Sequence, residues 1–182
     1  MGQGPGAKAR PPPILLRAHF PEAWRILLIL DERSKGVHGD DEAKAFSGLP
    51  PLSDTAAAHV CRLVLMQLVP GLMEADIDAF GAAITEIQAI VGGHFAAAQG
   101  GSAWTSPAVG RIAEKAKGAG AIGIGQSSWG PTGFAFTPSK ENAQHLYDSL
   151  IGAARAEGLE ILIAQGRNRG ALVEQVASTQ NE

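Results

Sequence analysis

The chain has 182 residues, of which 45% are hydrophobic, a formal net charge of −3 and a pI near 5.9. This length predicts one domain with a sizeable core, and the slightly acidic charge without a basic run argues against a nucleic-acid-binding protein. Because Cys61 is the only cysteine, a disulfide framework is excluded. The sequence shows no uninterrupted apolar run of membrane-spanning length and no signal peptide, so we expect a cytoplasmic protein without a membrane partner.

The first part of the chain predicts two strands followed by a polar loop. Residues 1–13 are rich in glycine and proline and predict a flexible lead-in. Two apolar runs, 14–20 and 24–30, predict strands, and the second is continuous enough to be buried on both faces. Residues 31–41 predict a loop after that buried strand, where functional sites are often built. A solvated loop is the simpler interpretation of this segment. It nevertheless carries the densest set of ionisable groups in the chain, among them Asp31, His38 and Asp40.

The middle of the chain predicts helices. Their predicted ranges are 41–46, 54–69, 77–91 and 107–117. A capping side chain precedes each of the last three, and these caps are Ser53, Asp76 and Ser106. We expect Pro70-Gly71 and Gly92-Gly93 to end the second and third helices. An irregular segment at 94–105 contains Gln99.

The stretch 118–138 predicts a strand, a glycine-rich turn and a second strand. The turn, 125–132, reads Gly-Gln-Ser-Ser-Trp-Gly-Pro-Thr and is crowded with hydrogen-bonding groups. Successive free N–H groups in such a turn can form a concave site for an anion, although an ordinary hairpin turn is the simpler interpretation of these residue types. A helix at 139–157 and a strand at 159–164 complete the predicted elements.

This order of elements predicts an α+β sandwich, because locally paired strands are covered by helices. The last four elements, strand–strand–helix–strand, fit a ferredoxin-like half with a helical insertion ahead of it. We expect a domain at 14–170, preceded by the lead-in at 1–13 and followed by a tail at 171–182. The sequence lacks a nucleophile elbow, a Walker loop and a HExxH or CxxC motif. A phosphorylated small molecule is the natural ligand of a donor-rich turn, and Mg²⁺ would need Asp or Glu oxygens.

Residues 120–135 resemble the third motif of the GHMP kinase superfamily, where a GAxGxxxSGxGPTxFA-like turn lies near the phosphates of a nucleotide. The form found here, GIGQSSWGPTGFA, has a tryptophan in place of a small residue and is similar to the β-ribofuranosylaminobenzene 5′-phosphate synthases. The supporting segments are 20–25, 36–39, 45–51 and 98–101. The resemblance runs from about Pro11 to Gly166 and implies a ferredoxin-like two-layer sandwich of the GHMP kinase C-terminal type, with a helical insertion.

What the resemblance implies is a phosphoribosyl-transferring synthase of methanopterin biosynthesis, and so of one-carbon metabolism. Its partners would be phosphoribosyl diphosphate and 4-aminobenzoate or 4-hydroxybenzoate, its cofactor Mg²⁺, and its by-products CO₂ and diphosphate. Ser127, Ser128 and Thr132 would face phosphate oxygens, and Trp129 could stack on the benzoate ring. The full set of expected substrate- and phosphate-binding residues is Gln99, Gly125, Gln126, Ser127, Ser128, Trp129, Gly130 and Thr132. The catalytic candidate is His38, and the metal candidates are Asp31 and Asp40.

The family pattern also has an N-terminal half with a PxxxGxGS-like phosphate loop, which this sequence does not contain. The resemblance is therefore to the C-terminal half, and activity of this chain alone stays open. We expect a homo-oligomer or a separate N-terminal half as partner. Two alternatives remain: a non-catalytic association module derived from the family, and a GHMP-type small-molecule kinase relative. Trp129 and the missing nucleotide loop argue against the kinase.

Overall fold

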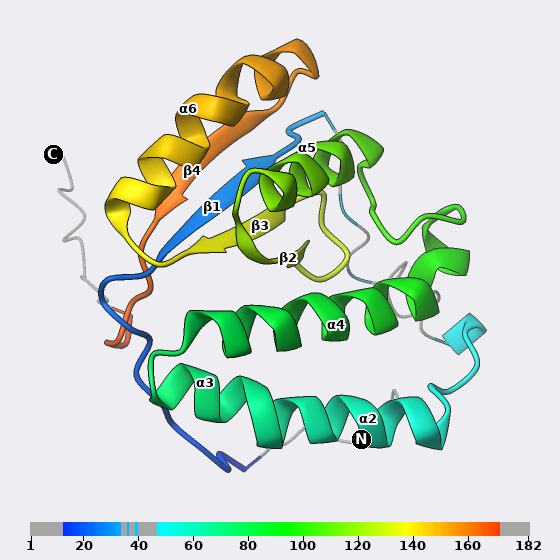
Figure 1. The fold of residues 1–182 in the computed structure, drawn as a ribbon. Coiled ribbons are helices and arrows are strands. Elements are labelled where there is room, and N and C mark those ends of the chain that lie inside the picture. Colours follow the sequence, from blue (N-terminus) through cyan, green and yellow to red (C-terminus); the bar gives the residue numbers. More distant parts are fainter. Residues whose placement is uncertain (1–12, 34–35, 37–38, 40–46, 172–182) are drawn as a thin grey trace, which may run out of the picture.

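The computed structural model describes residues 13–33, 36, 39 and 47–171, and a four-stranded antiparallel sheet lies at its centre. The strands are β1 (Arg25–Leu30), β2 (Ile122–Gln126), β3 (Gly133–Thr137) and β4 (Glu160–Ala164). Their order across the sheet is β2-β3-β1-β4 (Figure 1). Read from the other edge this is 4-1-3-2, and all described helices except α6 lie between β1 and β2 in the chain. The predicted α+β, ferredoxin-like class with a helical insertion is confirmed.

The described helices begin where the sequence places capping side chains. They are α2 (Asp54–Leu63), the π-helical turn η1 (Val64–Leu68), α3 (Val69–Met73), α4 (Ile77–Phe95), the 3₁₀ turn η2 (Ala96–Gln99), α5 (Pro107–Gly118) and α6 (Lys140–Ala156). A side-chain oxygen accepts a backbone N–H in the first turn at each of the predicted caps, which are Ser53, Asp76 and Ser106, and Ser139 caps α6 in the same way. Local capping chemistry was thus sufficient to locate these starts.

Alternate residues of β1 enter two different hydrophobic clusters, which explains its nearly continuous apolar sequence. Leu27 and Ile29 are fully buried under α5 and α6 on one face of the sheet. Ile26 lies on the other face, in a cluster built around Trp24, Phe80 and Phe136. The strand is therefore buried on both faces, as its sequence predicts.

The predicted strand at 14–20 is wrong, because these residues have no regular secondary structure from 13 to 20. An apolar run forms a strand only when another strand bonds its backbone. Here the side chain of Asn168 bonds Phe20 instead: its Oδ1 accepts the Phe20 N–H at 2.8 Å and its Nδ2 donates to the Phe20 carbonyl at 2.8 Å.

Both predicted helix breaks are also wrong. Helix α2 continues through η1 and α3 to Met73, and the π turn precedes Pro70, where the wider turn relieves the clash a proline makes with the preceding helix. Helix α4 runs through Gly92-Gly93 to Phe95, and Gly92 serves close packing, since a Cβ there would lie 3.1 Å from Ala103 Cβ. The predicted helix at 41–46 lies outside the described residues.

The α2–α3 helix has an exposed apolar face. Leu65, Met66 and Met73 are 67%, 71% and 66% exposed. By length and composition alone, the 20 residues from Asp54 to Met73 could cross a membrane, with a mean hydropathy of 1.5. One such helix is weak evidence for a membrane span, because helices of soluble proteins meet the same criteria.

Helix α4 covers the outer edge of β2 and satisfies its backbone. Thr85 Oγ1 accepts the Ile124 N–H at 3.4 Å, and Gln88 Oε1 accepts the Gln126 N–H at 2.9 Å. A bulge in β2 places Gly123 at a φ of +65°, a conformation that glycine adopts easily. Side chains of α4 therefore supply hydrogen-bond acceptors to this edge of β2, as a fifth strand would otherwise do. In this way α4 fixes the strand that leads into the glycine-rich turn.

Candidate functional site

The glycine-rich turn closes the β2–β3 hairpin and presents two hydroxyl groups to solvent. The Ser127 N–H donates to the Thr132 carbonyl at 2.9 Å, and the Gly130 N–H donates to the Ser127 carbonyl at 3.1 Å. Ser127 and Ser128 are exposed. Ser128 has a φ of +54°, which is unusual for a residue other than glycine and often marks a functional turn.

A buried amide network joins this turn to the segment that contains Gln99. Gln126 is 8% exposed, and its Oε1 accepts the Thr105 N–H at 2.6 Å. Its Nε2 donates to Gln99 Oε1 at 3.0 Å and to the Ser128 carbonyl at 2.9 Å. The Thr105 hydroxyl donates to Gln99 Oε1 at 2.6 Å. Two predicted site residues, Gln99 and Gln126, are thus in direct contact, and Gln126 orients the Ser128 peptide.

Trp129 is the buried anchor of the turn. Its side chain is 4% exposed and its ring centroid lies 4.6 Å from that of Phe95. It lines a cavity of about 250 Å³ together with Gln99, Gln126 and Ser128. Phe95 therefore already packs against the indole of Trp129. The stacking of Trp129 on a substrate ring stays a prediction.

The polar loop after β1 reaches the turn, at least at Gly36. A Cβ on Gly36 would lie 2.7 Å from Gly130 Cα and 2.8 Å from the Trp129 carbonyl oxygen, so the two backbones are in close contact. His38 and Asp40, the catalytic and one metal candidate, lie outside the described residues. The contact at Gly36 therefore places this part of the loop directly beside the glycine-rich turn.

Asp31, the other metal candidate, links the end of β1 to the start of α5. Oδ1 accepts from the backbone N–H of Arg33 at 3.2 Å and from its Nε at 2.9 Å. Oδ2 accepts from Arg33 Nη2 at 3.2 Å and from the Ser106 hydroxyl at 2.8 Å. These four bonds use the lone pairs that a cation would need, so Asp31 does not fit a Mg²⁺ ligand in this arrangement. Elsewhere in the described part of the chain, no three His, Cys, Asp or Glu side chains cluster as a metal site would require.

The hydrogen bonds from Arg33 lower the pKa of Asp31, and this makes its contribution to stability dependent on pH. A lowered carboxyl pKa stabilises the fold above the ordinary value, and that contribution is lost as the pH falls through the folded-state pKa. We expect Asp31→Asn to lower the free energy of unfolding by about 1 kcal/mol at pH 7, since Arg33 is largely exposed and the pair is screened.

Urea unfolding at two pH values checks this expectation. The deficit of Asp31→Asn should shrink as the pH falls below the ordinary carboxyl pKa, because the unfolded wild-type chain then binds a proton before the folded chain does. The control is Asp148→Asn on the exposed side of α6, for which we expect little change at either pH. An equal deficit at both pH values would contradict the assigned role of the carboxylate.

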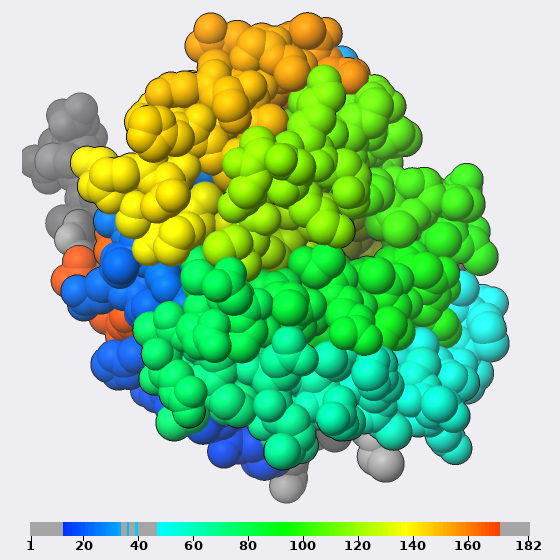
Figure 2. Space-filling view, in the orientation of Figure 1, coloured from blue at the N-terminus to red at the C-terminus, as the bar shows by residue number. Residues whose placement is uncertain are grey.

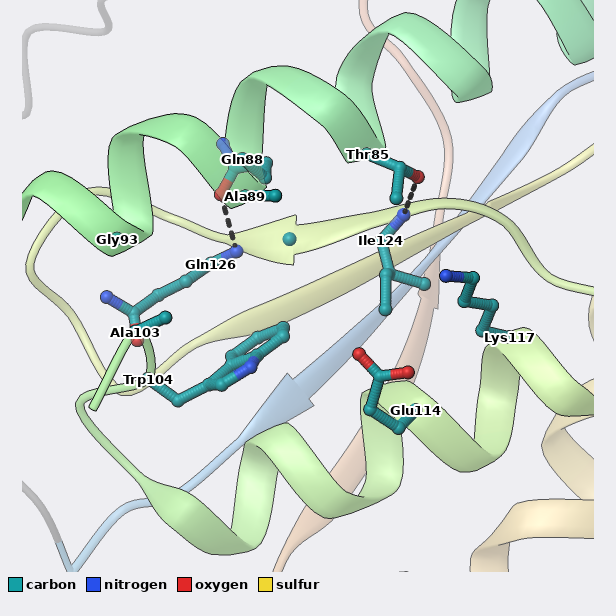
Figure 3. A pocket seen from close by; sticks show the side chains of 11 residues that line it. Thr85, Gln88, Ala89, Gly93, Ala103, Trp104, Glu114, Lys117, Ile124 and Gln126 are labelled. Carbon is teal, nitrogen blue, oxygen red and sulfur yellow. Dashed lines mark hydrogen bonds between the residues drawn. The ribbon is translucent and has the colours of Figure 1, made fainter. Parts of the chain in front are cut away.

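A second cavity opens between α4, β2 and α5, and the sequence reasoning did not find it. It measures about 330 Å³. Figure 3 shows side chains from all three elements around it, and its polar and aromatic lining residues are Thr85, Gln88, Trp104, Glu114, Lys117 and Gln126. Gln126 belongs to the glycine-rich motif, but the other five residues come from distant parts of the sequence and match no motif. The fold alone brings them together, because α4 and α5 approach the same edge of the sheet at β2.

Comparison with known proteins gives the same picture of the domain. Residues 68–155 match the family model described as GHMP kinases C terminal. The beta-ribofuranosylphenol 5′-phosphate synthases of Methanothermobacter thermautotrophicus and Archaeoglobus fulgidus are 33% and 31% identical over 92% of this chain. The chain spans about half the length of these curated relatives, 48% and 50%. A homoserine kinase from Cytophaga hutchinsonii shares the fold, with a TM-score of 0.55 and 19% identity over 82% of this chain and 43% of that one.

Proposed function

We propose that this chain forms part of a beta-ribofuranosylphenol 5′-phosphate synthase in methanopterin biosynthesis, because residues 68–155 match the GHMP kinases C terminal model and the relatives at 31% and 33% identity are synthases of that name. The reaction joins phosphoribosyl diphosphate to 4-hydroxybenzoate or 4-aminobenzoate in the cytoplasm. The observation that carries the proposal is the turn at 127–132, whose two exposed hydroxyls sit on a hairpin end fixed by Gln126.

In the proposed reaction, the ring carbon that bears the carboxylate attacks the ribose carbon that bears the diphosphate. A carbon–carbon bond forms, and the diphosphate leaves with the electron pair of its carbon–oxygen bond. The bond to the carboxylate then breaks, CO₂ leaves, and its electron pair restores the aromatic ring. Ser127, Ser128 and Thr132 would bind the 5′-phosphate, and the amide network would hold these donors in position before substrate arrives.

Mg²⁺ is proposed as the counterion of the diphosphate, where it would neutralise charge on the leaving group. Asp31 does not fit as its ligand, because Arg33 and Ser106 already bind both carboxylate oxygens. Asp40 and His38 keep their proposed roles as metal ligand and acid–base group, and both require direct testing by substitution.

Benzoate-dependent release of CO₂ and diphosphate from phosphoribosyl diphosphate tests the proposal. The chain is assayed alone and together with the N-terminal half of the Methanothermobacter relative, which supplies the part of the family that this chain does not match. Product with 4-hydroxybenzoate or 4-aminobenzoate, and none without a benzoate, supports the synthase. Phosphate transfer from ATP instead would favour the kinase alternative, and no reaction in either mixture would contradict the synthase.

A second candidate, a non-catalytic association module, is favoured by the exposed apolar face of the α2–α3 helix. Leu65, Met66 and Met73 are at least 66% exposed, and such side chains are often covered by a partner. This candidate, like a homo-oligomer or a separate N-terminal half, predicts association in solution. Sedimentation of the wild-type chain should then show an assembly, and a Leu65→Glu, Met66→Glu double variant should lose that assembly. A wild-type chain that stays monomeric, both alone and with the N-terminal half, would exclude the association module.

A further inference from the structure

The cavity between α4, β2 and α5 has the dimensions of a small-molecule site. Its volume of about 330 Å³ lies at the lower end of the range found for ligand pockets, which favours a small ligand. Both helices that border it lie on the face of the molecule seen in Figure 2. The cavity floor is the outer edge of β2, at Ile124 and Gly125. The three hydroxyl residues assigned above to phosphate, Ser127, Ser128 and Thr132, are not among its lining residues.

A flat aromatic wall closes one side of this cavity. The indole of Trp104 is half-buried, and Gly110 of α5 makes room for it, since a Cβ at Gly110 would lie 2.8 Å from Trp104 Cδ1. Small or aliphatic side chains, Ala89, Ala103 and Ile124, line much of the remaining wall. A planar ring is the shape that such a slot accepts best, because it can lie against the indole face.

Two opposite charges on α5 face this cavity without being paired to each other. Glu114 and Lys117 are three positions apart, a spacing at which opposite charges on a helix commonly interact. Neither side chain, however, forms an ion pair or a hydrogen bond in the part of the chain that the structure describes. Figure 3 shows the carboxylate of Glu114 and the ammonium group of Lys117 directed toward the cavity. Both charges are therefore available to a ligand.

The signs of these charges restrict the ligand that fits between them. A simple acid would be attracted by Lys117 but repelled by Glu114, and a simple amine would meet the reverse. A molecule with one positive and one negative group finds an opposite charge at both positions. Side chains three residues apart have Cβ atoms about 5–6 Å apart, so both head groups can reach one compact group. An α-amino acid carries its ammonium and carboxylate on a single carbon and meets this requirement.

We propose that the α4–β2–α5 cavity is a binding site for an aromatic α-amino acid. Its ammonium group pairs with Glu114, its carboxylate pairs with Lys117, and its ring lies against Trp104. This ligand is not a substrate of the reaction proposed above, and the inference does not rest on that function. It rests on the two unpaired charges and the aromatic wall of the same cavity.

Titration calorimetry with L-phenylalanine and two analogues that each lack one charge tests the assignment. We expect L-phenylalanine to bind more tightly than 3-phenylpropionate, which has no ammonium group, and than 2-phenylethylamine, which has no carboxylate. Lys117→Gln should weaken L-phenylalanine binding about fivefold, the upper value for one exposed ion pair, and should not weaken binding of the amine. Glu114→Gln should weaken L-phenylalanine to a similar extent, yet tighten 3-phenylpropionate because a like charge is removed.

Two further variants separate the cavity from general effects of charge. Lys115→Gln is the matched control, because Lys115 lies on the same helix but lines a different surface, and its replacement should leave all three affinities unchanged. Trp104→Leu keeps an apolar side chain but removes the flat wall, and it should weaken all three ligands. A thermal melt of each variant establishes that it is folded before binding is measured.

Three results would overturn the inference. No binding of L-phenylalanine to the folded wild-type chain would exclude the site. Equal affinities for L-phenylalanine and 3-phenylpropionate, both insensitive to Glu114→Gln, would remove the ammonium group from this place. Equal effects of the Lys115 and Lys117 substitutions would remove the carboxylate. Binding of phosphoribosyl diphosphate is measured separately, so each of these results leaves the proposed function to its own test.

Discussion

A Gln126→Glu variant is expected to lose about 2–4 kcal/mol of unfolding free energy at pH 7, although the two side chains have nearly the same shape. The Nε2 of Gln126 donates to Gln99 Oε1 and to the Ser128 carbonyl. A carboxylate oxygen at that place would face two acceptors inside a site where the residue is 8% exposed. The bond from the Thr105 N–H would survive, so the loss comes from the donor side alone.

Thermal or urea unfolding measures this effect, and pH identifies its cause. The deficit should shrink near pH 4, where the new carboxyl is protonated and can donate again. Gln165→Glu is the control, because Gln165 is exposed and its replacement should change the unfolding free energy by less than about 0.5 kcal/mol. If Gln126→Glu were as stable as this control, the amide network would not be what holds the turn.

A Gly81→Val variant is expected to lose about 3 kcal/mol of unfolding free energy, because it separates α4 from β2. A Cβ on Gly81 would overlap Ile122 Cγ2 and would lie 2.9 Å from the backbone nitrogen of Gly123. A rotamer change cannot relieve the contact with the Gly123 nitrogen, because that atom belongs to the backbone of β2. The bonds that Thr85 and Gln88 accept from β2 would lengthen as the helix moved.

Urea unfolding of Gly81→Val and Gly152→Val separates this packing effect from helix propensity. A Cβ at Gly152, in the interior of α6, would meet nothing within 4 Å. Since valine is a slightly better helix former than glycine, Gly152→Val should raise stability by up to about 0.5 kcal/mol. Similar stabilities for the two variants would show that α4 does not depend on this close approach.

Features governed by neighbouring residues could be predicted from the sequence. The helix caps at Ser53, Asp76 and Ser106 and the β2–β3 hairpin are of this kind, since a capping serine or aspartate bonds the backbone N–H three residues further along the chain. The residues of a hairpin turn likewise set the backbone conformation of that turn alone. The ferredoxin-like class followed from the order of these elements.

Features that depend on distant partners could not be predicted. Residues 14–20 are apolar enough for a strand, but Asn168, 148 positions from Phe20, bonds that backbone instead. Pro70 did not end its helix, because the π turn before it absorbs the clash. The cavity lined by Trp104 and Lys117 exists only where two helices leave part of one strand edge uncovered.

The most direct test of the central claim is a thermal melt of the chain with phosphoribosyl diphosphate and Mg²⁺, with ATP and Mg²⁺ as the comparison. Ligand at about 100 times its dissociation constant adds roughly 2.7 kcal/mol, which for a chain of this size is a rise of roughly 5–10 °C. We predict this rise with phosphoribosyl diphosphate and Mg²⁺ but not with ATP and Mg²⁺. The rise should be lost in a Ser127→Ala, Ser128→Ala double variant and kept in Ser149→Ala on α6. No rise with either ligand, or an equal rise in the double variant, would contradict a phosphate site at the turn.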